Sequence, residues 1–109
     1  MFLQAVTSAL SQWYFNRVQQ TLNFTLDQMN SFYRVFFIPG MHHCGGGPGA
    51  WSMGQPQYPL DTNKIDTAHN ALLALVDWVE DGQPPSSMIG TKHKDDDISA
   101  RVLAERSEL

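Results

Sequence analysis

"FFIPGMHHCGGGPGAWSMGQ", residues 36–55, joins the end of an apolar run to two histidines, the only cysteine and three consecutive glycines. The run 32–38, FYRVFFI, is aromatic and β-branched with no polar alternation at its end. That pattern predicts a strand buried on both faces, as in a parallel sheet covered by helices. Pro39 and Gly40 end the strand. The Gly- and Pro-rich segment 41–61 is then too long for a simple turn, and loops of that size are usually functional.

A helix is predicted on each side of this stretch. In residues 7–22 the spacing of Leu10, Trp13, Tyr14 and Val18 forms the apolar stripe of an amphipathic helix, with Thr7 or Ser8 as N-cap. We expect this stripe to pack against a sheet. Residues 23–31 are polar and form a loop with at most a helical turn.

The second helix has the clearer pattern. Asp66 or Thr67 is the expected N-cap, and Gly82 the expected C-cap. One face of this helix is apolar and consists of Ala68, Leu72, Leu75, Val76 and Val79.

The order helix, buried strand, long loop, helix indicates an α/β protein. No second strand is predicted, because the segment after Gly82, with Lys92, Lys94 and Asp95–Asp97, has the mixed charges of a solvated surface. A single buried strand leaves its own N–H and C=O groups unpaired. We therefore expect the chain to be part of a larger α/β sheet that is incomplete by itself.

Length and charge exclude several classes of protein. At 109 residues the chain is one ordinary domain, and its 42% hydrophobic content is typical of a packed globular protein. The net charge of -4, without a basic stripe, argues against a nucleic-acid or anionic-membrane partner. No apolar run is long enough to span a bilayer, and the N-terminal residues lack the basic region of a signal peptide.

Two further features depend on the cellular compartment. Cys44, as the only cysteine, has no partner for a disulfide within the chain. Asn23-Phe24-Thr25 is an acceptor site for N-glycosylation if the protein is secreted.

The group His42, His43 and Cys44 admits several interpretations. Imidazole and thiolate are zinc ligands, but neighbouring residues of an extended chain point in opposite directions, and no spacing supplies further ligands. A phosphate loop is excluded because no GK[ST] follows the glycines. The group could also be an ordinary glycine-rich surface loop. In the catalytic interpretation, a histidine on the loop after a late strand is the general base, which is the position it has in α/β-hydrolases.

The quoted stretch, together with the later ALLALVDWVEDGQPPSSMIGTK, resembles the C-terminal part of the tannase and feruloyl esterase family. The matching pair is a PGM-x-HC-x-GG-x-GA core and a later ALV-x-WVE-x-G-x-(A/P)P. TSALSQWYFNRV is also similar to the helix that precedes the strand in that family. The resemblance extends from about Phe2 to Lys92, so we expect residues 1–92 to be the C-terminal portion of the catalytic domain and 93–109 a polar, divergent tail.

The resemblance implies a secreted serine esterase of the α/β-hydrolase fold, with a calcium site in an inserted lid. We expect neither the lid nor its calcium ligands in this chain, and therefore no cofactor. It implies that His43 is the catalytic histidine and that Cys44 forms a disulfide with a cysteine directly before the catalytic serine. His42 then occupies a variable position and is a loop or pocket residue. Trp51 and Met53 either line an aromatic acyl pocket or anchor the loop in the core.

The chain departs from this family pattern at the other catalytic positions. It contains no Cys-Ser pair and no G-x-S-x-G motif, and MFLQ at its start offers no carboxylate for the acid. Asp27 is taken as a surface residue. We therefore expect a fragment of a carboxylic ester hydrolase, inactive alone, whose complete form cleaves small phenolic esters of the feruloyl or galloyl type. The alternative is a small non-catalytic binding module that uses His42, His43 and Cys44 for a metal.

Overall fold

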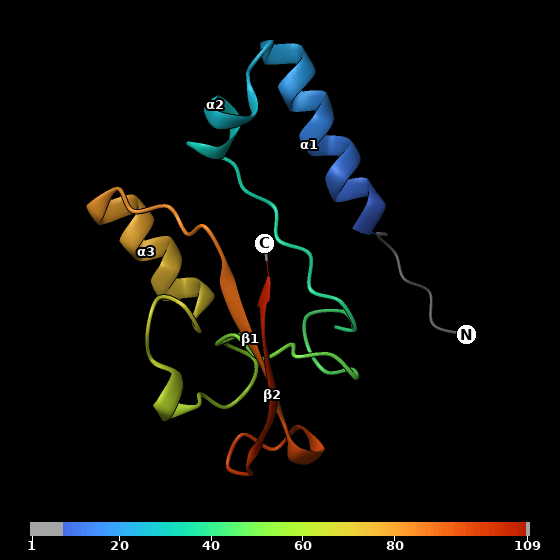
Figure 1. Ribbon diagram of the computed structural model, residues 1–109, viewed down its shortest axis with the longest axis vertical. Helices are drawn as coiled ribbons and strands as arrows, with labels where there is room; N and C mark the ends of the chain where they lie inside the picture. The colour runs from blue at the N-terminus through green and yellow to red at the C-terminus, as the bar shows by residue number, and fades with distance from the viewer. Residues whose placement is uncertain (1–7, 109) are drawn as a thin grey trace. The chain divides into compact units, whose positions relative to one another are not determined.

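The computed structural model describes residues 8–108, which divide into two compact units with their boundary between Phe37 and Ile38. The first unit contains two helices, and the second contains a hairpin of two strands with one α-helix and two short 3₁₀ helices (Figure 1). The elements are α1 (Ser8–Leu22), α2 (Leu26–Asn30), η1 (Thr62–Lys64), α3 (Ala71–Asp81), β1 (Met88–His93), η2 (Lys94–Asp96) and β2 (Val102–Glu108). Within this described range, no helix combines the length and apolarity needed to cross a membrane.

Helix α1 confirms the first predicted helix. Its buried side chain is Phe15, whose ring centroid lies 5.1 Å from that of Tyr33. The predicted apolar stripe is not the buried face of this helix, because Leu10, Trp13 and Tyr14 are each about half exposed. The expected packing of that stripe against a sheet is therefore not seen. Thr7, one of the two expected caps, lies outside the described residues.

The loop after α1 contains the short helix α2. Thr25 and Gln28 form a capping box, in which the Gln28 amide donates to Thr25 Oγ1 and the Thr25 amide donates to Gln28 Oε1. Asn23 is exposed in the preceding turn, at a φ of 52°. Asp27 is exposed on α2, as expected of a surface residue.

The predicted buried strand at 32–38 is wrong. These residues belong to no strand, and both Phe32 and Phe37 are exposed. The physical reason is the one that makes an isolated strand unfavourable: no other segment within residues 8–108 pairs with this run. The predicted α/β class is therefore correct for the helices. The sheet of the described residues is formed by a later part of the sequence, after α3.

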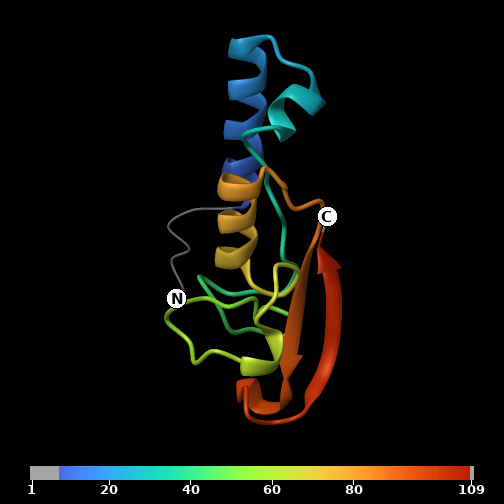
Figure 2. The same cartoon turned by 90° about the vertical axis from the view of Figure 1, so that its left-hand side faces the viewer.

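That sheet is an antiparallel hairpin of β1 and β2, which the sequence analysis did not predict. Its register runs from Met88 opposite Glu108 to His93 opposite Val102, with an irregularity between Lys92 and His93. Figures 1 and 2 show the two strands side by side along their whole length.

The hairpin has no apolar pattern because only one of its strands is substantially buried. Met88, Gly90, Thr91 and His93 of β1 are buried, whereas in β2 only Glu108 is. Period-two alternation of apolar residues requires one face of a strand to lie in the core, and β2 does not meet that condition.

The free edge of β1 holds the end of the glycine-rich loop. Ser52 and Thr91 exchange two backbone hydrogen bonds, of 3.0 and 2.9 Å, and form an antiparallel bridge. Beside it the backbones approach so closely that a Cβ on Gly90 would lie 2.0 Å from the carbonyl oxygen of Ala50. The segment 50–52 is thus held to the edge of the hairpin by this single bridge.

Helix α3 confirms the second predicted helix and its C-cap, but not its start. Gly82 ends the helix in the left-handed conformation at a φ of 67°. The N-cap is Asn70, whose Oδ1 accepts from the amides of Leu72 and Leu73. Asp66 instead accepts from the amides of Ala68 and His69 and closes a separate turn, so the helix begins later than predicted.

The apolar face of α3 is exposed rather than buried. The exposed fractions are 60% for Leu72 and 76% for Val79, whereas Ala74 on another face is buried. The periodicity predicted the helix correctly, but within residues 8–108 no segment covers the stripe.

The close approach at Gly90 gives a direct test of this architecture. Gly90→Ala places a methyl group against the Ala50 carbonyl, and overpacking of this kind destabilises a protein by roughly 1–3 kcal/mol. We expect a lower urea midpoint and faster hydrogen exchange at the Ser52 and Thr91 amides. Gly82→Ala is the control, because no atom lies within 4 Å of its added Cβ and only backbone strain results. Equal exchange rates at Ser52 and Thr91 in the two variants would contradict the account.

Candidate functional site

The loop that carries the predicted catalytic histidine is closed by two backbone hydrogen bonds. The amide of Gly49 donates to the carbonyl of Gly40 over 3.0 Å, and the amide of His42 donates to the carbonyl of Gly46 over 3.1 Å. His43, Cys44 and Gly45 therefore form the tip of a compact loop.

Gly45 in the tip packs against an aromatic ring. A Cβ there would lie 2.4 Å from a ring carbon of Tyr58, so a side chain would displace the ring. The Tyr58 ring in turn packs against Trp51, with centroids 4.7 Å apart. The glycines thus let the tip approach the aromatic pair.

His43 and Cys44 are both exposed, and their side chains contact each other. Cys44 Sγ lies 2.9 Å from His43 Nδ1 and 3.8 Å from Nε2. Cys44 adopts a φ of 67° and is a free thiol. Within residues 8–108, no carboxylate forms a hydrogen bond or ion pair with His43. Its Nδ1 faces the sulfur, and among the described residues no partner lies closer to its Nε2 than the sulfur at 3.8 Å.

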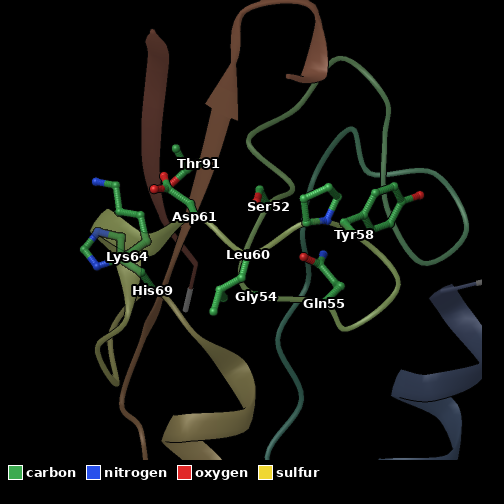
Figure 3. Close-up of a pocket in the computed structure, with 10 residues that line it drawn as sticks. Ser52, Gly54, Gln55, Tyr58, Leu60, Asp61, Lys64, His69 and Thr91 are labelled. Carbon is green, nitrogen blue, oxygen red and sulfur yellow. The ribbon is translucent and has the colours of Figure 1, made fainter. Parts of the chain in front are cut away.

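Of the three other loop residues predicted for the site, one is exposed and two are buried in the core. His42 is exposed. Trp51 and Met53 are buried, with exposed fractions of 2% and 6%. The Trp51 indole Nε1 donates to Asp96 Oδ1 over 2.8 Å. Both side chains anchor the loop, and neither lines the pocket shown in Figure 3.

Two glutamines, which the sequence analysis did not single out, brace the loop. Gln55 accepts from the Met53 amide and donates to the Trp51 carbonyl, at 2.9 and 2.7 Å. Gln57 donates to the carbonyl of Cys44 over 3.0 Å. All three partner groups lie on the backbone, so the sequence carries no signal for these contacts.

A small pocket lies between the loop, η1 and β1 (Figure 3). Its volume of about 10 Å³ admits a single water molecule and excludes an organic substrate. Thr91 Oγ1 and His69 Nε2 are buried without a hydrogen-bond partner among the described residues. The lining residues are Ser52, Gly54, Gln55, Tyr58, Pro59, Leu60, Asp61, Lys64, His69 and Thr91.

A charged cluster joins the segment before α3 to strand β2. Asp66 accepts from the His69 ring over 2.8 Å, and Lys64 pairs with Glu105. The His69 hydrogen bond holds the pKa of Asp66 below its usual range, and the Lys64 hydrogen bond does the same for the pKa of Glu105. Because these groups pair with each other, the cluster is structural.

His93 on β1 is also held by protein groups. Its Nε2 lies 3.3 Å from Asp61 Oδ2, and its Nδ1 lies 3.2 Å from the carbonyl oxygen of Ala100. The side chain is buried and ties the hairpin turn to η1.

No metal site is assembled from the predicted residues. In the part of the chain that the structure describes, no three His, Cys, Asp or Glu side chains converge as ligands. The alternative metal-binding role of His42, His43 and Cys44 therefore gains no support. The calcium site implied by the resemblance likewise has no fitting set of donors among residues 8–108.

Comparison with known proteins gives a family match over most of the chain. A sequence model described as "Tannase and feruloyl esterase" matches residues 4–107. The chain is 36% identical over 103 residues to "Probable feruloyl esterase B-2" of Aspergillus flavus, covering 94% of this chain and 20% of that protein. It is 42% identical over 87 residues to "Feruloyl esterase B" of Aspergillus niger, covering 80% of this chain and 16% of that protein.

Solved structures agree with these matches. An esterase from Aspergillus oryzae gives a TM-score of 0.83 at 33% identity, and feruloyl esterase B from the same organism gives 0.80 at 31% identity. Each match covers 94% of this chain and 20% of the solved chain. The chain thus spans about one fifth of the length of its relatives.

Acid is predicted to release the Trp51 anchor. The hydrogen bond from Lys92, reinforced by the bond from Trp51 and by the charges of Lys92 and His42, holds the pKa of Asp96 below its ordinary value of 3.8. The stabilisation is therefore complete above pH 3.8 and is lost as the pH falls through the lowered pKa. Because the Asp96 side chain is 39% exposed, we expect a local change rather than global unfolding.

The measurement is an NMR titration of the Trp51 indole N–H, with the Trp13 indole as internal reference. Asp96→Asn keeps an acceptor oxygen and is expected to abolish the titration. A midpoint at or above 3.8 in the unsubstituted chain would contradict the prediction.

Proposed function

The chain belongs to the tannase and feruloyl esterase family, and from this premise we propose that His43 is the general base of a serine carboxylic ester hydrolase. The observation that carries the proposal is the placement of His43: an exposed imidazole at the tip of a loop closed by two backbone hydrogen bonds and held to β1. A general base needs such fixed support together with access to the substrate.

In the proposed reaction a serine hydroxyl attacks the ester carbonyl while His43 Nε2 accepts its proton. The resulting imidazolium then donates that proton to the departing alcohol, which leaves an acyl-enzyme. Water, deprotonated by the same nitrogen, releases the acid. We propose that the serine and the acid, in an α/β-hydrolase fold, belong to the part of the relatives' length that this chain does not span.

The substrate class follows from the relatives. Their names are those of feruloyl esterases, and the description of the family adds tannase. We therefore propose a small phenolic ester of the feruloyl or galloyl type. We also propose secretion, which the family resemblance implies, and Asn23, exposed in a turn, is then the proposed glycosylation site. A mass unchanged by deglycosylation of the secreted protein would contradict that assignment.

Cys44 is proposed, from the family resemblance, to act as one half of a disulfide, and its contact with His43 shows what oxidation would change. A thiol 2.9 Å from His43 Nδ1 can donate its hydrogen to that nitrogen. The neutral ring would then carry its hydrogen on Nε2, where the serine proton must be accepted. A disulfide sulfur has no hydrogen to donate, so oxidation of Cys44 leaves Nδ1 free to donate to an acid and Nε2 free to accept.

The proposal is tested in a graft. This chain replaces the segment that it matches in feruloyl esterase B of Aspergillus oryzae, and hydrolysis of methyl ferulate and methyl gallate is followed. We expect His43→Ala to lower kcat/KM by roughly 10³-fold or more, because the base is lost. His42→Ala is the matched control and is expected to retain activity. The unmodified 109-residue chain is expected to give no turnover.

Two results would overturn parts of this proposal. A folded, active graft that is unaffected by His43→Ala would overturn the role of His43 as the base. Turnover by the chain alone that His43→Ala abolishes would overturn the placement of the serine and the acid outside this sequence. Recovery of Cys44 as a free thiol in an active graft, by unreduced peptide mapping, would contradict the disulfide.

A further inference from the structure

A lysine from the hairpin reaches the loop that carries His43. Lys92 Nζ donates to the carbonyl oxygen of Gly47 over 2.6 Å and to Asp96 Oδ1 over 2.5 Å. The same carboxylate oxygen accepts from the Trp51 indole. One ammonium therefore joins the loop backbone, a core side chain and the hairpin turn.

The surroundings make this contact stronger than an ordinary surface bond. The Lys92 side chain is only 19% exposed, and the Trp51 beside it is buried. Hydrogen bonds from a charged donor are roughly twice as strong as neutral ones, and partial burial reduces their screening by water. Asp96 balances the charge, so the ammonium is not left unpaired.

The bonded carbonyl lies where it controls the loop tip. Gly47 stands between Gly46, which accepts from the His42 amide, and Gly49, which donates to Gly40. A change in the Gly47 peptide would alter both closing bonds and with them the direction of the His43 ring. A misplacement of about 1 Å in a catalytic group can cost about 10²-fold in rate.

We propose that Lys92 is a positioning residue for His43, acting through the Gly47 carbonyl and held in place by Asp96. The inference rests on the proposed function of His43. It differs from a purely structural role, because Lys92 fixes the geometry of a reacting group rather than the stability of the whole unit. Arginine can also reach a carbonyl with a charged donor, whereas methionine keeps the aliphatic volume without one.

The experiment compares Lys92→Met, Lys92→Arg and the control Lys94→Met, which removes an exposed lysine of η2 outside this network. In the 109-residue chain, we expect Lys92→Met to speed hydrogen exchange at the His42 and Gly49 amides by about tenfold, with β1–β2 amides unchanged. In the graft, we expect kcat to fall by roughly 10- to 100-fold with little change in KM. Lys92→Arg is expected to restore most of both properties, and Lys94→Met to change neither.

The outcomes separate this inference from the function on which it rests. A graft that loses activity with His43→Ala but keeps its kcat with Lys92→Met overturns the role of Lys92 alone. Unchanged exchange at His42 and Gly49 in the chain overturns it as well. A folded graft that is inactive without any substitution counts against the proposed function, and the exchange measurement then decides whether Lys92 holds the loop.

Discussion

The contact on which the second unit depends is the backbone pairing between β1 and the end of the glycine-rich loop. Ser52 and Thr91 exchange backbone hydrogen bonds. Next to this bridge, the backbone at Gly90 lies too close to the Ala50 carbonyl for position 90 to carry a side chain. Because the loop is fixed there, Trp51 lies in the core and its indole reaches Asp96. The same pairing brings Lys92 to the Gly47 carbonyl, so the position of His43 follows from the edge of a strand.

The sequence could predict those parts of the fold that local chemistry decides. The periodicity of apolar residues predicted α1 and α3. Gly82 was predicted to end α3, because a residue without a Cβ adopts the left-handed conformation of a C-cap without strain. The strand predicted at 32–38 failed because apolar, β-branched composition makes a strand favourable only where a neighbour can pair with it. The hairpin was not predicted because β2 pairs with β1 without being buried. A strand that is mostly exposed has no apolar pattern by which its sequence could be recognised.

The candidate site shows a similar division. His43 and Cys44 stand in a short motif, so a resemblance could identify them. Lys92 and Asp96 were predicted to be solvated charges. No local pattern indicates that the hairpin brings Lys92 to a carbonyl 45 residues earlier in the chain. Gln55 and Gln57 were missed because they bind backbone atoms, which have no sequence signature. The residues that we propose to position His43 are thus harder to predict from sequence than His43 itself.

The central claim is that the loop bearing His43 is built onto β1 by two reciprocal hydrogen bonds. The most direct measurement is the scalar coupling through those bonds, from the amide nitrogen of each residue to the carbonyl carbon of the other, in the isotopically labelled chain. The account predicts couplings in both directions between Ser52 and Thr91. Their absence in a chain that still shows the β1–β2 couplings would contradict it.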